Sequence, residues 1–348
     1  IDGTYSQCRI RTYRAVIRKR QLMVSYRQAL LMSVPLGIIA AFAPRQAAEA
    51  QTLNLYQNPS SVFVPFALGS SPSGNRLVGL PHLSISLNDG TAQPMTMDTG
   101  STGIIVSPDI FTPPANAISN GAGTQIYNST GIKSTGTWYI TDVAIHAPNS
   151  GAVLATANVP VLLVNSQTCL PHARNCTIVA GSTPSGVAMF GIGFGQEPAQ
   201  QPQGVPANNP LLNITGLSGD GMPSHGYVLD TAGIQIGLTP NNTQGFAMVK
   251  LAPSTTASTY APGSPNAFVS TLPNRPDWMR APASIVVNGA VGNGTMLMDT
   301  GVPGMFLTAP PDAIVQTNTN LALGCKTSCA AANTAIQVIM PGQTTPIA

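Results

Sequence analysis

The sequence is poor in charge and in aromatic side chains. Only 8% of its 348 residues are Asp, Glu, Lys or Arg, and only 5% are Phe, Trp or Tyr. Coiled coils, helix bundles and charged disordered chains need far more Glu, Lys and Arg, so the composition excludes these classes. No amphipathic pattern longer than about 12 residues predicts a long helix.

Several catalytic motifs are missing as well. The chain has no Gly-x-Ser-x-Gly nucleophile elbow, no Gly-rich phosphate loop and no dinucleotide-binding fingerprint. The four histidines belong to no motif: His82, His146, His172 and His225. Serine hydrolase chemistry and nucleotide binding are therefore disfavoured.

The positive net charge of +3 comes from the start of the chain. Residues 1–50 hold eight basic and two acidic side chains, which leaves seven basic and ten acidic ones in the remainder. Nucleic-acid binding requires a basic surface, and the rest of the chain cannot supply one. We expect no nucleic-acid partner.

The same N-terminal region resembles an export signal. From Met23 a cationic start leads into the apolar stretch Ala29 to Ala43, and Ala48-Glu49-Ala50 follows as a small-x-small cleavage site. About 15 apolar residues are too few to span a membrane, although a retained anchor is the alternative. Residues 1–50 are thus predicted to be upstream sequence plus a signal peptide. The protein would be secreted, periplasmic or extracellular, with no stable membrane insertion after signal removal.

Cysteine usage agrees with export. Four cysteines follow the leader, and an even number in an oxidising compartment predicts disulfides. Cys169–Cys176 and Cys325–Cys329 are the simplest of three possible pairings. Metal binding by Cys169, His172 and Cys176 is the alternative, but zinc sites usually have closer Cys spacing.

Abundant Gly (34) and Pro (31) favour short strands joined by many turns. The most informative pattern is an internal repeat: 97–106 (MDTGSTGIIV) and 298–307 (MDTGVPGMFL). Each copy follows a predicted hairpin, Leu83 to Met97 through Asn88-Asp89-Gly90 and Ser284 to Met298 through Asn288-Gly289. The 201-residue spacing predicts one copy in each of two lobes.

Two Asp-Thr-Gly turns in one β-rich chain point to a specific chemistry. Two carboxylates about 3 Å apart cannot both ionise, so they share one proton and titrate as a pair. The charged member can act as a general base on water, while the protonated member donates to the attacked carbonyl. Gly permits a tight turn, and the Thr hydroxyl can brace one turn against the other.

On these residues the chain resembles the pepsin-like aspartic proteases, as a secreted member of bacterial type. The resemblance spans Leu83 to about Leu307 and implies a mainly β, bilobal fold with Asp98 and Asp299 as the catalytic residues. It assigns catalytic-loop support to Thr99, Gly100, Ser101, Thr300 and Gly301. Met189-Phe190-Gly191 would complete the first lobe's loop crossing. Tyr127 would be the substrate-binding flap tyrosine, with Tyr139 as the alternative.

The sequence also departs from the family pattern. Val302 replaces the hydroxyl residue expected after Gly301, and Ile105 replaces a Trp that usually follows the first motif. Only 49 residues follow Asp299, so we expect a C-terminally truncated second lobe. The predicted domains are 1–50 (leader), 51–240 (first lobe) and 241–348 (second lobe).

The sequence thus predicts an aspartic endopeptidase that needs no metal or organic cofactor. Its partner would be a polypeptide substrate in a cleft between the lobes, and the protein would be a monomer. Two alternatives remain: an inactive binding protein on the same fold, and a secreted β-rich structural or adhesion protein.

Overall fold

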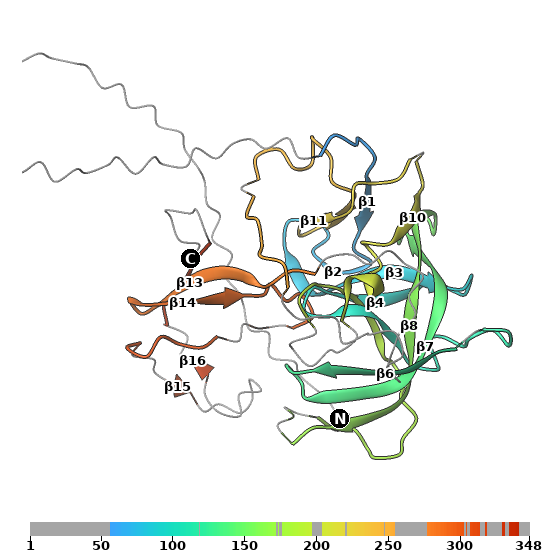
Figure 1. Ribbon diagram of the computed structural model, residues 1–348, viewed down its shortest axis with the longest axis horizontal. Helices are drawn as coiled ribbons and strands as arrows, with labels where there is room; N and C mark the ends of the chain where they lie inside the picture. Colours follow the sequence, from blue (N-terminus) through green and yellow to red (C-terminus); the bar gives the residue numbers. More distant parts are fainter. Residues whose placement is uncertain are drawn as a thin grey trace, which may run out of the picture. The chain divides into compact units, whose positions relative to one another are not determined.

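The computed structural model describes residues 56–117, 119–171, 173, 176–196, 204–219, 221–246, 248–254, 277–302, 304, 307–313, 317–318, 329–330 and 334–340. The leader, Cys325, Met305 and Phe306 lie outside these residues, so the predictions made for them stay predictions. The described chain is mainly β, arranged in several sheets (Figure 1), which confirms the predicted class. A short 3-10 helix, η2 (Pro206–Asn208), interrupts the strands. No helix among the described residues is long and apolar enough to cross a membrane.

The largest sheet has nine strands. These are β2 (Leu68–Ser70), β3 (Leu77–Leu87), β4 (Gln93–Asp98), β5 (Thr102–Val106), β6 (Ser119–Tyr127), β7 (Ile132–His146), β8 (Val153–Cys169), β9 (Ala188–Ile192) and β10 (Ile214–Leu217). Six of these strands pair in the order β8-β5-β9-β4-β3-β7, and β7 also pairs with β8. Six strands therefore form a closed ring, which removes most of the exposed strand edges.

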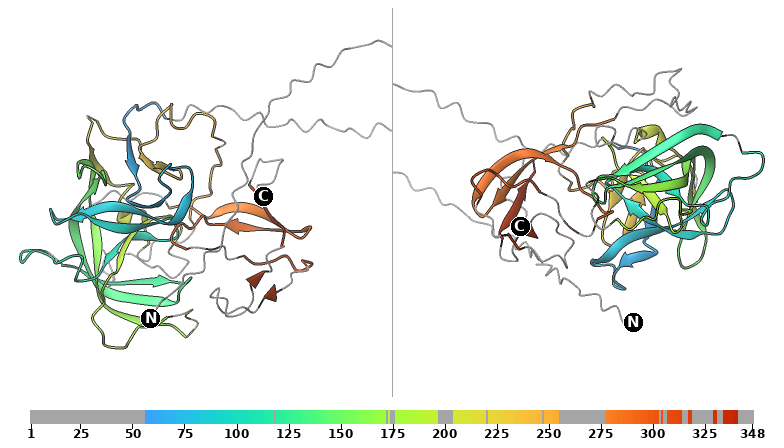
Figure 2. Two further views of the ribbon diagram at one scale, coloured as in Figure 1. Left: turned by 180° about the vertical axis from the view of Figure 1, so that it is seen from behind. Right: turned by 90° about the horizontal axis from the view of Figure 1, so that it is seen from below.

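The long strands β7 and β8 dominate this sheet. They span 15 and 17 residues and pair from Ile132↔Cys169 to His146↔Val153. Figure 2 shows them as curved neighbours, with β6 alongside β7. The pair carries β6 and the β6–β7 turn, which matters for the site described below.

Apolar residues at alternate positions fill the main core. Leu83, Ile85 and Leu87 of β3 are buried together, as the two-residue period of a strand requires. All five residues of β5 are buried, as expected for a strand inside the ring. A second buried cluster contains Ile105 of β5 and Trp138 of β7. Ile105 stands where the family pattern has a Trp, and here the indole that packs in this cluster comes from β7 instead.

Both hairpins predicted beside the repeated motif are confirmed. In the first, β3 pairs with β4, and Asn88 and Asp89 in the turn have φ of 48° and 56°. In the second, β13 (Ala281–Val287) pairs with β14 (Ala290–Met296) through Asn288 and Gly289, at φ of 48° and 88°. Asn, Asp and Gly tolerate this left-handed conformation best.

Three small sheets complete the described chain. β1 (Val62–Pro65) and β11 (Tyr227–Leu229) flank β12 (Gly233–Ile236), while β14 and β17 (Ile336–Ile339) flank β13. β15 (Thr317–Asn318) pairs with β16 (Cys329–Ala330). Among the described strands, those up to β12 pair only with one another, and so do those from β13 onward. This pattern is compatible with two lobes, whose boundaries stay predictions.

Candidate active site

Asp98 stands at the end of β4, where three strands meet. β9 lies between β4 and β5, parallel to the first (Asp98↔Gly191) and antiparallel to the second (Thr102↔Ile192). The backbones of β9 and β5 lie close together at Gly191, where an added Cβ would lie 2.7 Å from the carbonyl oxygen of Gly103. A larger residue there would disturb the loop that carries Asp98, so Gly191 fits the crossing for a steric reason.

The threonines of the two Asp-Thr-Gly motifs hold the motifs together. The amide of Thr99 donates to the Thr300 hydroxyl (3.1 Å), and the amide of Thr300 donates to the Thr99 hydroxyl (3.0 Å). Each hydroxyl in turn donates to a backbone carbonyl of the other motif, at Met298 (2.6 Å) and Met97 (2.9 Å). This reciprocal network joins segments 201 residues apart in the sequence.

The glycines bring the two carboxyl groups close to each other. A Cβ at Gly100 would overlap the Asp299 carboxyl, and a Cβ at Gly301 would overlap that of Asp98. Each Asp therefore lies against the glycine of the opposite motif, in space that no other residue type leaves open. The structure thus brings Asp98 and Asp299 together.

The two aspartates have different surroundings. Asp98 is 3% exposed, and it accepts hydrogen bonds from the Gly100 amide (2.7 Å) and the Ser101 hydroxyl (2.5 Å). Asp299 is half-buried and accepts a hydrogen bond from the Gly301 amide (2.8 Å). Val302 follows at the position where Ser101 stands in the first motif, and it has no hydroxyl to donate.

Burial raises the pKa of Asp98 to about 6, against an ordinary value of 3.8. The Ser101 hydroxyl opposes this rise in pKa, and the negative charge of Asp299 adds to it. Burial and a neighbouring carboxylate both disfavour the ionised form. The Asp98 carboxyl therefore keeps its proton at pH values where an exposed Asp has lost it.

Both aspartates line a cavity of about 720 Å³. The first motif contributes Asp98 and Gly100 to its wall, and the second contributes Asp299, Gly301 and Val302. Further walls come from the β6–β7 turn, from the start of β9 and from residues 278–280. A volume of this size falls in the usual range for ligand pockets.

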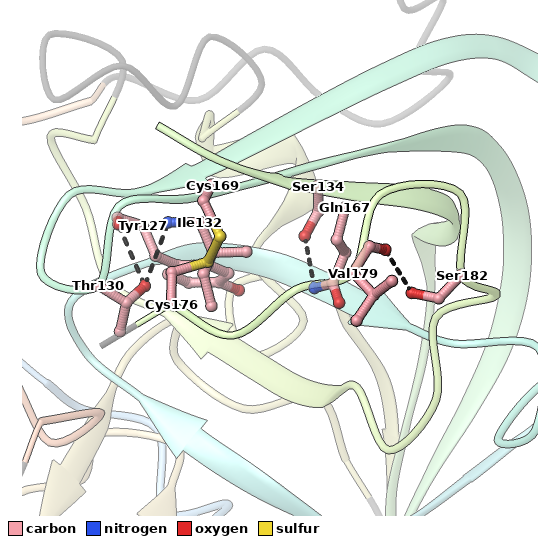
Figure 3. The surroundings of a disulfide bond; sticks show 9 residues. All are labelled: Tyr127, Thr130, Ile132, Ser134, Gln167, Cys169, Cys176, Val179 and Ser182. Atoms are coloured by element: carbon pink, nitrogen blue, oxygen red, sulfur yellow. Dashed lines mark hydrogen bonds between the residues drawn. A yellow bond between two sulfur atoms is a disulfide. The ribbon is translucent and has the colours of Figure 1, made fainter. Parts of the chain in front are cut away.

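Tyr127, at the end of β6, also lines this cavity. Figure 3 shows it beside the Cys169–Cys176 disulfide. Its hydroxyl is buried; Ser101 and Gln125 lie near, but neither forms a hydrogen bond of normal geometry with it. Burial and the charge of Asp98 raise its pKa, so the hydroxyl stays neutral. Tyr139, the alternative flap residue, is not among the lining residues.

Three residues near the site were not predicted from the sequence. Trp278 and Arg280 line the cavity, and Tyr227 donates its hydroxyl to the Ile192 carbonyl (2.8 Å). Burial and the nearby charge of Asp98 raise the pKa of Tyr227. Trp278 and Arg280 lie just before the second hairpin, but no motif includes them. Tyr227 lies more than 45 residues from either Asp-Thr-Gly motif, so the sequence offers no signal for it.

Cys169 and Cys176 form a disulfide with an S–S distance of 2.06 Å, as predicted. Their thiols are therefore not available as metal ligands. Within the described part of the chain, no group of three or more His, Cys, Asp or Glu side chains could hold a metal ion.

Comparisons with known proteins add little to this picture. A crystal structure similar to this chain is that of an aspartic proteinase from Irpex lacteus, with 12% identity and a TM-score of 0.40. The similarity covers 82% of this chain and 78% of that one. No family model matches the sequence, and no curated protein matches it. At this TM-score the likeness carries no conclusion about activity, which has to be inferred from the site.

Proposed function

We propose that this chain is an aspartic endopeptidase with a pepsin-like fold. The observation that carries the proposal is the mutual approach of Asp98 and Asp299, each against the glycine of the other motif. The raised pKa of Asp98 supports it, because a dyad that shares one proton needs a carboxyl that stays protonated. Thr99 and Thr300 would keep the motifs in register, and the secreted, bacterial-type assignment stays a prediction.

The proposed reaction is the addition of water to a peptide bond. The ionised carboxylate takes a proton from water, whose oxygen attacks the carbonyl carbon, while the protonated carboxyl donates its proton to the carbonyl oxygen. The tetrahedral intermediate then collapses: the carboxyl that took the proton from water gives it to the leaving nitrogen, the C–N bond breaks, and a hydroxyl of the intermediate returns its proton to the other carboxylate. The proton of the resting state belongs to the pair rather than to one residue.

The substrate in this proposal is an extended polypeptide that occupies the 720 Å³ cavity. Tyr127 would cover it and offer its neutral hydroxyl as a hydrogen-bonding group. The mechanism uses no metal or organic cofactor. The disulfide supports the proposal of a secreted protein, because disulfides persist in oxidising compartments. We retain the proposal that the protein acts as a monomer.

The proposal is tested by removing each carboxylate separately. We expect Asp98→Asn and Asp299→Asn each to reduce the rate of cleavage of an unfolded protein below neutral pH by a factor of at least about 10³. Asp89→Asn is the matched control, because Asp89 is an exposed turn residue at φ of 56°, where Asn is equally suitable. Cleavage that survives either active-site substitution would refute the dyad.

A second candidate function is peptide binding without cleavage. Val302 favours it, since Asp299 lacks the hydroxyl donor that Ser101 gives to Asp98. A chain with this function would bind peptides but release them intact at every pH. Mass spectrometry of the recovered peptide separates the two functions.

A further inference from the structure

A cationic residue lines the cavity that holds the two aspartates. Arg280 is the only Lys or Arg among its described lining residues, and it lies directly before β13. It is half-buried, whereas the basic residue Arg76 is exposed on a turn remote from the cavity lining. The cavity thus combines a negative dyad with one positive group.

Arg280 has no neutralising partner in the described part of the chain. Its guanidinium forms no hydrogen bond or ion pair with any described residue. Arg280 therefore borders the same cavity as Asp98 with no described group to neutralise its charge.

The backbone around Arg280 is fixed to the loop that supports Asp98. The Gly195 amide donates to both carboxylate oxygens of Asp277 (3.0 and 3.1 Å), and the Met279 amide donates to the Ala252 carbonyl (2.8 Å). Gly193, two residues before Gly195, donates its amide to the Ser101 carbonyl (2.7 Å). A chain of hydrogen bonds thus links the first motif to the segment that ends in Arg280.

We infer that Arg280 binds a carboxylate of the peptide substrate, so that the enzyme prefers Glu or Asp at one position that is not adjacent to the cleaved bond. This inference rests on the proposed peptidase function. A half-buried Arg whose guanidinium has no partner among the described residues is suited to a carboxylate, which it can bind through two parallel hydrogen bonds. The negative dyad repels an acidic side chain at the cleaved bond itself, so the preference belongs to a more distant subsite.

The test is a set of peptide pairs that differ by Glu or Gln at one position at a time. For the wild-type protein we expect kcat/KM to favour Glu at one position by roughly 10- to 100-fold, the effect of a charge-assisted hydrogen bond. In Arg280→Gln we expect this preference to disappear, so that kcat/KM for the Glu peptide becomes equal to that for the Gln peptide. Arg280→Lys keeps part of it, because a lysine supplies the charge without the planar fork.

Arg76→Gln is the matched control, since it removes one positive charge outside the cavity and should leave the preference intact. A wild-type protein that cleaves peptides with no acidic preference, or an Arg280→Gln variant that keeps the preference, overturns the inference but not the peptidase function. If the wild type cleaves nothing, the proposed function fails. The Arg280 inference is then decided by fluorescence anisotropy: tighter binding of the Glu peptide that Arg280→Gln abolishes supports it, and equal binding of both peptides overturns it.

Discussion

At the scale of single residues, the two aspartates are chemically unequal despite their identical motifs. Asp98 is buried and accepts from an amide and a hydroxyl, whereas Asp299 is half-buried and is followed by Val302. A carboxylate stabilised by more donors loses its proton more readily, while burial acts in the opposite direction. At Asp98 burial prevails, because its pKa rises to about 6.

The first prediction concerns Ser101, whose hydroxyl lowers the pKa of Asp98. Ser101→Ala removes this donor, so the pKa of Asp98 should rise further. The alkaline limb of the pH profile, where the shared proton is lost, should move to higher pH. Measuring kcat/KM between pH 3 and 8 checks this, with the exposed Ser73→Ala as the control. An alkaline limb that moves to lower pH would contradict the assignment.

The second prediction is that Asp98 lowers the stability of the folded protein at neutral pH. Between pH 4 and 6 the folded state retains a proton that the unfolded state has lost, so the free energy of unfolding falls as pH rises through this window. The difference between 3.8 and about 6 corresponds to about 3 kcal/mol.

Asp98→Asn removes this ionisation and should stabilise the protein at pH 7 by up to about 3 kcal/mol, with little effect near pH 3. Urea unfolding at the two pH values measures the difference. Equal stability of variant and wild type at pH 7 would show that Asp98 is not held in an unfavourable environment.

At the scale of elements, the β6–β7 hairpin is held by a third strand and a disulfide. Ile132 pairs with Cys169, and the Leu170 amide donates to the Gly131 carbonyl (2.8 Å). A Cβ at Gly131, which has φ of 76°, would overlap Ala173 in the segment that the disulfide closes. The turn beside Tyr127 is therefore packed against the Cys169–Cys176 loop (Figure 3).

The third prediction follows from this support. Replacing Cys169 and Cys176 together by Ala should lower the free energy of unfolding by about 2 kcal/mol, because the short loop is no longer closed. The freed turn should also raise KM, since Tyr127 lines the cavity. Urea unfolding and peptide kinetics measure the two effects. An unchanged KM would mean that the disulfide supports the fold without positioning the hairpin.

The fourth prediction concerns the network between the motifs. Thr300→Val leaves the Thr99 amide and the Met97 carbonyl without their partner, at a cost of about 2–4 kcal/mol. Misplaced aspartates should also reduce kcat by roughly 10- to 100-fold. Thr300→Ser keeps the hydroxyl and is the matched control. Equal kcat in the two variants would show that the hydroxyl does not position the dyad.

At the scale of the whole molecule, the repeated motif and its turns were sufficient to predict several features. Asn88-Asp89 and Asn288-Gly289 indicated the hairpins because few residues tolerate their backbone conformation. The same repeat suggested that Asp98 and Asp299 belong to one site, and the structure brings them together. Their catalytic roles stay predictions until activity is measured.

Other features depend on contacts that no local pattern encodes. The pairing of β7 with β8, which closes the ring, joins strands through a register that follows only from the folded core. Tyr227 approaches the site through tertiary packing, far from either motif, and Arg280 lines the cavity although nothing in the sequence before the second hairpin marks it. Long-range packing decides such positions, so sequence reasoning could not identify them.

The shared proton is most directly tested by kcat/KM of the wild-type protein for one peptide from pH 3 to 8. We expect a bell-shaped profile whose alkaline limb falls through about pH 6, where the pKa of Asp98 lies. Activity that stays constant up to pH 8 would contradict a mechanism that depends on a protonated carboxyl of the Asp98–Asp299 pair.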